Sequence, residues 1–161
     1  LPAYRYVQRR ASFIGGEIES AWNLVEREDL RLTLTAFWDM VRGTDVDQDE
    51  PLPRMPPMRL GVRIDGEAGP WLFGAGVRRA FAQERVPDAV FGTLDYQSTT
   101  PAHTFVDANI GYTLQRDAWE ARIFANVTNL TDAEGRNAVS FLKDVAPLPG
   151  RSVAVGVELS F

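Results

Sequence analysis

The chain has 161 residues, a net charge of −5 and no cysteine. This length suits one domain, and the lack of cysteine excludes disulfide scaffolds, thiolate zinc sites and cysteine nucleophiles. The acidic balance does not predict a basic binding surface, so no nucleic acid is expected among the partners. No apolar run approaches the length of about 18 residues that a transmembrane helix needs. The length of an apolar run does not detect transmembrane β-strands, because only every second residue of such a strand faces lipid.

Two strands are predicted first, over residues 14–24 and 30–40, where apolar side chains recur at every second position. A helix would instead spread the leucines of "LRLTL" around its circumference. The connector "VERED" at 25–29 is short. The two strands are therefore predicted to pair as an antiparallel hairpin.

The same alternation recurs in the rest of the chain and predicts five more strands. These strands are 58–65, 71–78, 106–114, 119–127 and 153–161. The connectors alternate between short ones, at 25–29, 66–70 and 115–118, and long ones, at 42–57, 82–103 and 129–150. Short turns on one side and long loops on the other are typical of outer-membrane barrels. The predicted fold is all-β: an antiparallel up-and-down meander of about seven strands that forms part of a transmembrane β-barrel.

Aromatic residues on the apolar parity gather at the short-turn ends of the predicted strands. They are Trp22, Trp71, Tyr112 and Trp119. Such a band predicts a girdle at one membrane interface. The only charges expected on this parity are Arg79 and Arg151, at the long-loop ends, where arginine can reach headgroup phosphates. The opposite, polar parity is expected to face the lumen.

The last third of the chain contains several motifs in a fixed order. "FVDANIGYTL" is followed by Asn-Leu-Thr-Asp at 129–132, a loop, Pro-Gly-Arg at 149–151 and the terminal Phe161. This combination closely resembles the C-terminal strands of TonB-dependent outer-membrane receptors. "YRYVQRRASFIGGEIE" and "LPRMPPMRLGVRI" are also similar to internal strands of that family.

The resemblance implies a receptor and transporter of the bacterial outer membrane that takes up a scarce nutrient, such as a metal or metal chelate, and not an enzyme. Substrate would bind to the loops and to a plug domain, on which the TonB complex acts. The last strand with Phe161 would be the signal for the barrel-assembly machinery, and the outer face would contact lipopolysaccharide and membrane lipid. No cofactor is expected.

Receptors of this kind have an N-terminal plug, a TonB box and about 22 strands, and these features are not visible in the sequence. Residues 1–161 are therefore predicted to be a C-terminal β-barrel segment that supplies wall, loops and assembly signal. Two other interpretations stay open. One is a small self-contained outer-membrane barrel with an adhesin or structural role, and the other is a soluble β-sandwich binding module, which would bury the same apolar parity in a core.

Candidate ligand contacts lie in the predicted loops. Asp45, Asp47 and Asp49 could collect hard cations or bridge lipopolysaccharide through divalent ions, but the loop lacks the glycine and distal glutamate of an EF-hand. His103, the only histidine, could be one ligand of a metal site completed elsewhere. The favoured interpretation is that the loop is only solvated and that the histidine has no ligand role. The sequence does not identify a metal that these residues would bind.

Overall fold

A computed structural model describes residues 8–88 and 97–161, which form eight β-strands. The strands are β1 (Ala11–Glu26), β2 (Leu30–Asp45), β3 (Glu50–Pro51), β4 (Arg59–Ala68), β5 (Trp71–Ala80), β6 (His103–Arg116), β7 (Trp119–Thr128) and β8 (Ser152–Ser160). No helix within the described residues is long and apolar enough to cross a membrane.

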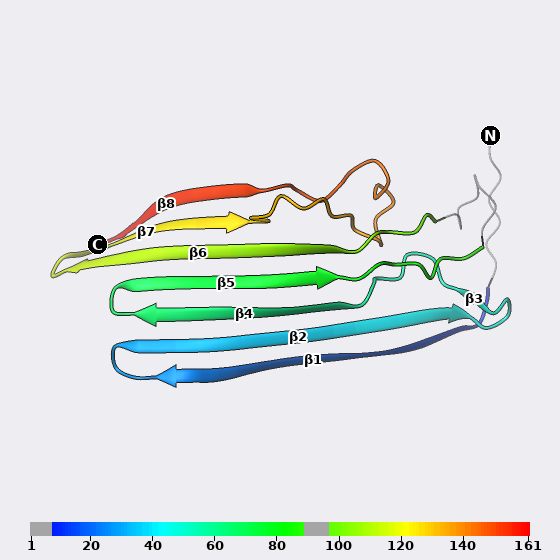
Figure 1. Cartoon of the computed structure of the whole chain (residues 1–161), viewed down its shortest axis with the longest axis horizontal. Helices are drawn as coiled ribbons and strands as arrows, with labels where there is room; N and C mark the ends of the chain where they lie inside the picture. The colour runs from blue at the N-terminus through cyan, green and yellow to red at the C-terminus, as the bar shows by residue number, and fades with distance from the viewer. Residues whose placement is uncertain (1–7, 89–96) are drawn as a thin grey trace.

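The strands form one antiparallel sheet in the order β1-β2-β4-β5-β6-β7-β8, and the short β3 pairs only with β2. The predicted meander of about seven strands is confirmed, with β3 as an addition inside a long loop. Short turns join the strands at one end of the sheet and long connections at the other (Figure 1). The described turns span 27–29, 69–70 and 117–118.

The strand register places the predicted apolar parity on one face of the sheet. Leu34 on β2 lies opposite Trp22 on β1 and Ile64 on β4, and the same parity continues to Val157 on β8, opposite Ile123. Many of these side chains are exposed in the isolated sheet. No second sheet covers this face within the described residues, contrary to the β-sandwich alternative, and an uncovered apolar face is what lipid would cover.

Charges mark the ends of this apolar face. Arg79 pairs with Leu60 across β4 and β5, as expected, but Arg42 is opposite Ile14 and Arg116 is opposite Trp119. The prediction that named only two charges was incomplete, because β2 and β6 are longer than their apolar repeats indicate. The middle of the face stays uncharged.

A β-bulge interrupts β1 near its end. The register shifts between Asn23 and Val25, so that Val25 lies opposite Leu32 and the intervening Leu24 is the extra residue. The prediction placed Leu24 on the apolar parity. One extra residue reverses the side on which the following side chains lie, which period-two counting does not detect.

The polar face is crossed by ion pairs between neighbouring strands. They are Arg31–Glu67 at 3.2 Å, Arg59–Asp39 at 3.0 Å, Arg78–Asp107 at 2.8 Å and Arg122–Glu158 at 2.5 Å. The pairs are exposed, and each contributes at most about 1 kcal/mol in water. Their regular placement gives this face the mixed charge of a lumen wall.

Candidate functional site at the long-loop end

The three long connections fold together at one end of the sheet (Figure 1). Their described parts, residues 46–58, 81–88, 97–102 and 129–151, are called the loop cap here. Five of the six buried polar residues in the described part of the chain lie within it: Gln83, Gln97, Thr100, Asn129 and Lys143. Since buried polar groups need partners, these side chains show what holds the cap together.

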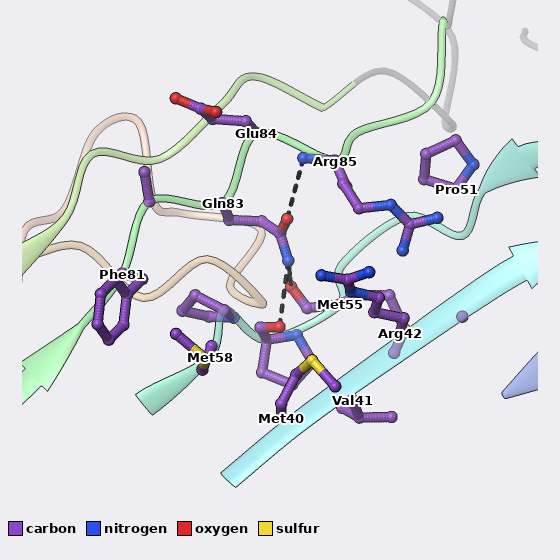
Figure 2. Close-up of a pocket in the computed structure, with 14 residues that line it drawn as sticks. Met40, Val41, Arg42, Pro51, Met55, Met58, Phe81, Gln83, Glu84 and Arg85 are labelled. Atoms are coloured by element: carbon purple, nitrogen blue, oxygen red, sulfur yellow. Dashed lines mark hydrogen bonds between the residues drawn. The ribbon is translucent and has the colours of Figure 1, made fainter. Parts of the chain in front are cut away.

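Gln83 joins two of the connections (Figure 2). Its Nε2 donates to the carbonyls of Met55 and Pro56 at 2.9 and 3.1 Å, and its Oε1 accepts from the Arg85 amide at 3.0 Å. Its backbone also exchanges two hydrogen bonds with Thr100. One side chain thus fixes residues 55–56 against the segment that follows β5.

Lys143 joins the last two connections, and it is the only lysine of the chain. Its Nζ donates to Thr100 Oγ1 at 3.0 Å, to the Thr99 carbonyl at 3.4 Å and to the Ser98 carbonyl. Burial lowers the pKa of this ammonium below its ordinary value, although the Asp144 carboxylate raises it in part. The buried charge is held by neutral oxygens.

Gln97 completes the network. Its Nε2 donates to the Ala138 carbonyl at 2.9 Å, and its Oε1 accepts from the Arg54 amide. The Arg54 guanidinium lies 3.5 Å from the centre of the Phe141 ring. All three long connections are therefore bound to one another through side-chain to backbone contacts.

The Asn-Leu-Thr-Asp motif shapes the start and the end of the last connection. Asn129 is 3% exposed and has a φ of 49°. Its Nδ2 donates to the carbonyls of Ala133 and Pro149, while its Oδ1 accepts from the Ala133 amide. Asp132 Oδ1 accepts from the Arg151 amide at 2.8 Å. The motif therefore brings the Pro-Gly-Arg segment back to the beginning of the loop, directly before β8.

A cavity of about 240 Å³ opens between the long-loop end of β2 and the segment after β5 (Figure 2). All three methionines of the chain, Met40, Met55 and Met58, line it. Arg42 and Arg85 also line it. Thioethers suit soft metal ions, but the two guanidinium charges oppose a cation. Within the described residues, no cluster of three or more His, Asp or Glu side chains could hold a metal ion.

In the acidic loop, which contains Asp45, Asp47 and Asp49, the first two carboxylates already form ion pairs with arginines. Asp45 is 5% exposed and accepts from Arg9 at 3.0 Å, and Asp47 pairs with Arg10 at 2.8 Å. Asp45 is the last residue of β2, and it follows Arg42, which marks the long-loop end of the apolar face. Burial raises the pKa of Asp45, but the hydrogen bonds from Arg9 and from the amides of Asp47 and Gln48 together lower it by more. The pKa is therefore below the ordinary value. These pairs leave less charge for an external cation, and a ligand role for Asp45, Asp47 and Asp49 stays a prediction.

His103 lies apart from the three aspartates, at the start of β6. Its ring packs against Phe105, with centroids 4.9 Å apart. No described hydrogen bond or ion pair joins it to the acidic loop. The structure therefore does not bring the predicted loop ligands together in one place.

The predicted girdle residues lie where the sequence places them, at the short-turn end of the apolar face. Trp22, Trp71 and Trp119 are 40–47% exposed. Trp71 meets Tyr112 edge to face, with ring centroids 4.7 Å apart. Phe161 follows β8 at the same end and is 98% exposed (Figure 1). Their roles at the interface and in assembly stay predictions.

Sequence reasoning missed the buried residues that build the loop cap. Gln83 and Gln97 stand in irregular polar segments, where no periodicity distinguishes a buried amide from a solvated one. Lys143 could have been noticed from composition, because it is the single lysine among 17 basic residues, the other 16 being arginines. Of the residues that build the loop cap, only Asn129 and Asp132 were named from the sequence, because they belong to the Asn-Leu-Thr-Asp motif.

The comparisons with known proteins agree with this arrangement. Residues 3–130 match the family described as "TonB dependent receptor-like, beta-barrel". Among solved structures, a protein titled "Copper transporter OprC" superposes with a TM-score of 0.75 and 22% identity, over 91% of this chain and 22% of that chain. At this identity the likeness shows the fold alone. No curated protein is significantly similar to the chain.

The family match covers most of the chain, and the sheet has the two faces that such a barrel wall requires. The family consists of outer-membrane transport proteins and not of enzymes, and the chain is placed in the bacterial outer membrane accordingly. The chain belongs to the TonB-dependent receptor-like β-barrel family.

Proposed function

We propose that the protein containing this chain imports a scarce nutrient across the outer membrane, driven by the TonB complex. The observation that carries the proposal is the family match over residues 3–130. The sheet supports it: one face is apolar, and the other carries cross-strand ion pairs suited to a polar lumen. The chain spans about a fifth of the similar solved transporter, at 22% of its length. The plug through which TonB would act is therefore sought in the full-length protein.

Within that transporter, residues 1–161 would be the C-terminal barrel segment. The strands would supply wall, and the loop cap would supply part of the substrate entrance. The open edges β1 and β8 would pair with neighbouring strands, since unpaired backbone groups are untenable in hydrocarbon. Trp22, Trp71, Tyr112 and Trp119 would meet the lipid interface.

Energised uptake is the decisive test of this function. Cells that express the full-length receptor, and a matched strain without it, are given radiolabelled metals as aqua ions and as chelates. Copper is the first probe because the similar structure is titled a copper transporter. We expect receptor-dependent accumulation that falls to background when a protonophore removes the inner-membrane potential. Accumulation that persists with the protonophore would indicate a passive pore and contradict the proposal.

The assembly role of Phe161 has a separate test. Deletion of this residue should lower the amount of receptor in the outer membrane several-fold, because the barrel-assembly machinery would lose its signal. The yield is measured by quantitative immunoblot of membrane fractions, with Phe161→Tyr as the control that retains an aromatic ring. Normal insertion after the deletion would remove the signal interpretation.

A further inference from the structure

Arginines on the two faces of the sheet differ in their partners. On the polar face, every strand arginine forms an ion pair with a carboxylate; these residues are Arg31, Arg59, Arg63, Arg78 and Arg122. On the apolar face, Arg42 and Arg79 have no carboxylate partner within the described residues. The charges of the polar face are therefore neutralised within the wall, whereas those at the long-loop end of the apolar face are not.

Arg85 lies in the segment after β5 and reaches the same side of the sheet as Arg42. Its Nη2 donates to Thr44 Oγ1 at 3.5 Å, and Thr44 follows Arg42 by two residues on β2, so both of these side chains lie on one face. Both arginines line the cavity of about 240 Å³ at the long-loop end of β2 (Figure 2). The one carboxylate of that lining, Glu84, points away from both guanidinium groups in Figure 2 and forms no ion pair within the described residues. Two positive charges thus lie close together on the outer face.

Arg79 adds a third guanidinium on this face, nearer the middle of the sheet. It lies opposite Leu60 on β4, and its Nη1 donates to Thr104 Oγ1 on β6 at 2.9 Å. Its guanidinium carbon lies 5.3 Å from the centre of the Phe81 ring, which is two residues closer to the long loops. The side chain therefore bends toward the loop end, as arginine side chains do at a membrane interface.

Apolar side chains adjoin the three arginines. Met40, Met58 and Phe81 line the same cavity. Toward the middle of the sheet, the paired Val62 and Val77 are 49% and 41% exposed and continue the apolar face. A ligand at this place would meet guanidinium groups at one end and apolar carbon at the other. This arrangement fits an amphiphile better than a free anion.

Strands from the rest of a barrel would not cover these arginines. Such strands can pair only with the open edges, which are β1 and β8. Arg42 lies on β2 and Arg79 on β5, and the strands on both sides of β2 and of β5 are described. A carboxylate on an added strand would therefore not lie next to either arginine.

We propose that Arg42, Arg79 and Arg85 bind the phosphate group of a lipid in the outer leaflet, with the acyl chains of that lipid against the apolar face. Guanidinium groups donate paired hydrogen bonds to phosphate oxygens. Three positive charges favour a phosphate monoester, with a charge of about −1.5 to −2 at pH 7, over the single charge of a phosphodiester. Lipid A, the phosphorylated glycolipid anchor of lipopolysaccharide, has this chemistry. The site is on the outer face, so the proposal does not depend on transport.

Binding to the purified full-length receptor in a neutral detergent tests the proposal by native mass spectrometry. The probes are phosphorylated lipid A, the same lipid after removal of its phosphates, phosphatidylglycerol and inorganic phosphate. We expect phosphorylated lipid A to bind about tenfold or more tightly than the dephosphorylated lipid, because the charge-assisted hydrogen bonds are lost with the phosphate. Phosphatidylglycerol should bind more weakly than lipid A, and inorganic phosphate at equal concentration should not displace lipid A.

Substitutions locate the site. Arg42→Gln, Arg79→Gln and Arg85→Gln should each weaken lipid A binding about tenfold, the usual effect of losing one charge-assisted hydrogen bond. Arg42→Lys should weaken it less, since it keeps the charge. Arg116→Gln is the matched control: Arg116 is also exposed on the apolar face and has no carboxylate partner within the described residues, but it lies at the short-turn end. Its substitution should leave lipid A binding unchanged.

Four results would each overturn the proposal. Equal losses from Arg116→Gln and Arg42→Gln would indicate a general attraction between charges. Equal binding of the dephosphorylated lipid would exclude the phosphate contact. Displacement of lipid A by inorganic phosphate would indicate a site for the free ion, and equally tight binding of phosphatidylglycerol would indicate a site for any anionic lipid.

Discussion

The strands and the loop cap are stabilised in different ways. In the sheet, ladders of backbone hydrogen bonds hold the strands, and the side chains only decide which face meets lipid and which meets water. In the cap, single side chains such as Gln83, Gln97, Asn129 and Lys143 bond to backbone atoms of distant segments. A substitution in the sheet should therefore act through the surrounding medium, and one in the cap through the loss of a particular buried contact.

The largest effect on stability is predicted for a substitution in the strands. Leu34→Arg places a charge in the middle of the apolar face, between Trp22 and Ile64. It should lower the free energy of unfolding of the full-length receptor in lipid by about 2–4 kcal/mol, the usual cost at the bilayer midplane. Urea titration followed by tryptophan fluorescence measures it.

The adjacent residue provides the control. Thr33 lies on the polar face, opposite Asn23 and Asp65. Thr33→Arg should change stability by less than about 1 kcal/mol, because the new guanidinium meets water and a carboxylate. Similar losses from both substitutions would show that the two faces are assigned wrongly.

In the cap, Asn129→Ala should have the next largest effect. It removes three side-chain hydrogen bonds and places alanine at a φ of 49°. We expect a loss of about 2–3 kcal/mol in the local opening free energy of residues 129–151, measured by hydrogen exchange. Asn129→Gly should lose about 1 kcal/mol less, since glycine adopts positive φ without strain.

Asn137→Ala is the control in the same loop. Asn137 is exposed, and its Oδ1 accepts only the Val139 amide at 3.3 Å. Its substitution should have little effect. If it weakened the loop as much as Asn129→Ala does, the special role of the buried amide would be refuted.

The same contrast explains what the sequence predicts and what it does not. Period-two repeats located the long strands, because the medium on each face selects side chains position by position. The repeats could not show the extra residue at Leu24 or the extension of β2 to Asp45, since both depend on pairing with a neighbour. Contacts such as Gln97 to Ala138 cross 41 positions. No local pattern in the sequence records such a contact.

A smaller effect is expected when the buried ammonium is removed. Lys143→Met keeps a long side chain but leaves the carbonyls of Ser98 and Thr99 without their donor. The local opening free energy of the cap should fall by about 1–2 kcal/mol, while the strands keep their protection from hydrogen exchange. Lys143→Arg is the matched variant that keeps the charge. Loss of protection throughout the sheet would contradict the separation of the two regions.

The smallest effect is a pH dependence confined to the cap. The pKa of Lys143 is lowered in the folded protein because burial disfavours its charged form. Between this lowered pKa and the ordinary value of 10.5, the opened loop binds more protons than the closed loop. The cap should therefore become more stable as pH rises through this window and lose that gain as pH falls. Hydrogen exchange at residues 98–100, corrected for the intrinsic rate at each pH, measures the change. Lys143→Met should abolish the dependence, because methionine does not titrate; a dependence that survives this substitution would have to arise from another group, and the buried ammonium would then not control the closure of the cap.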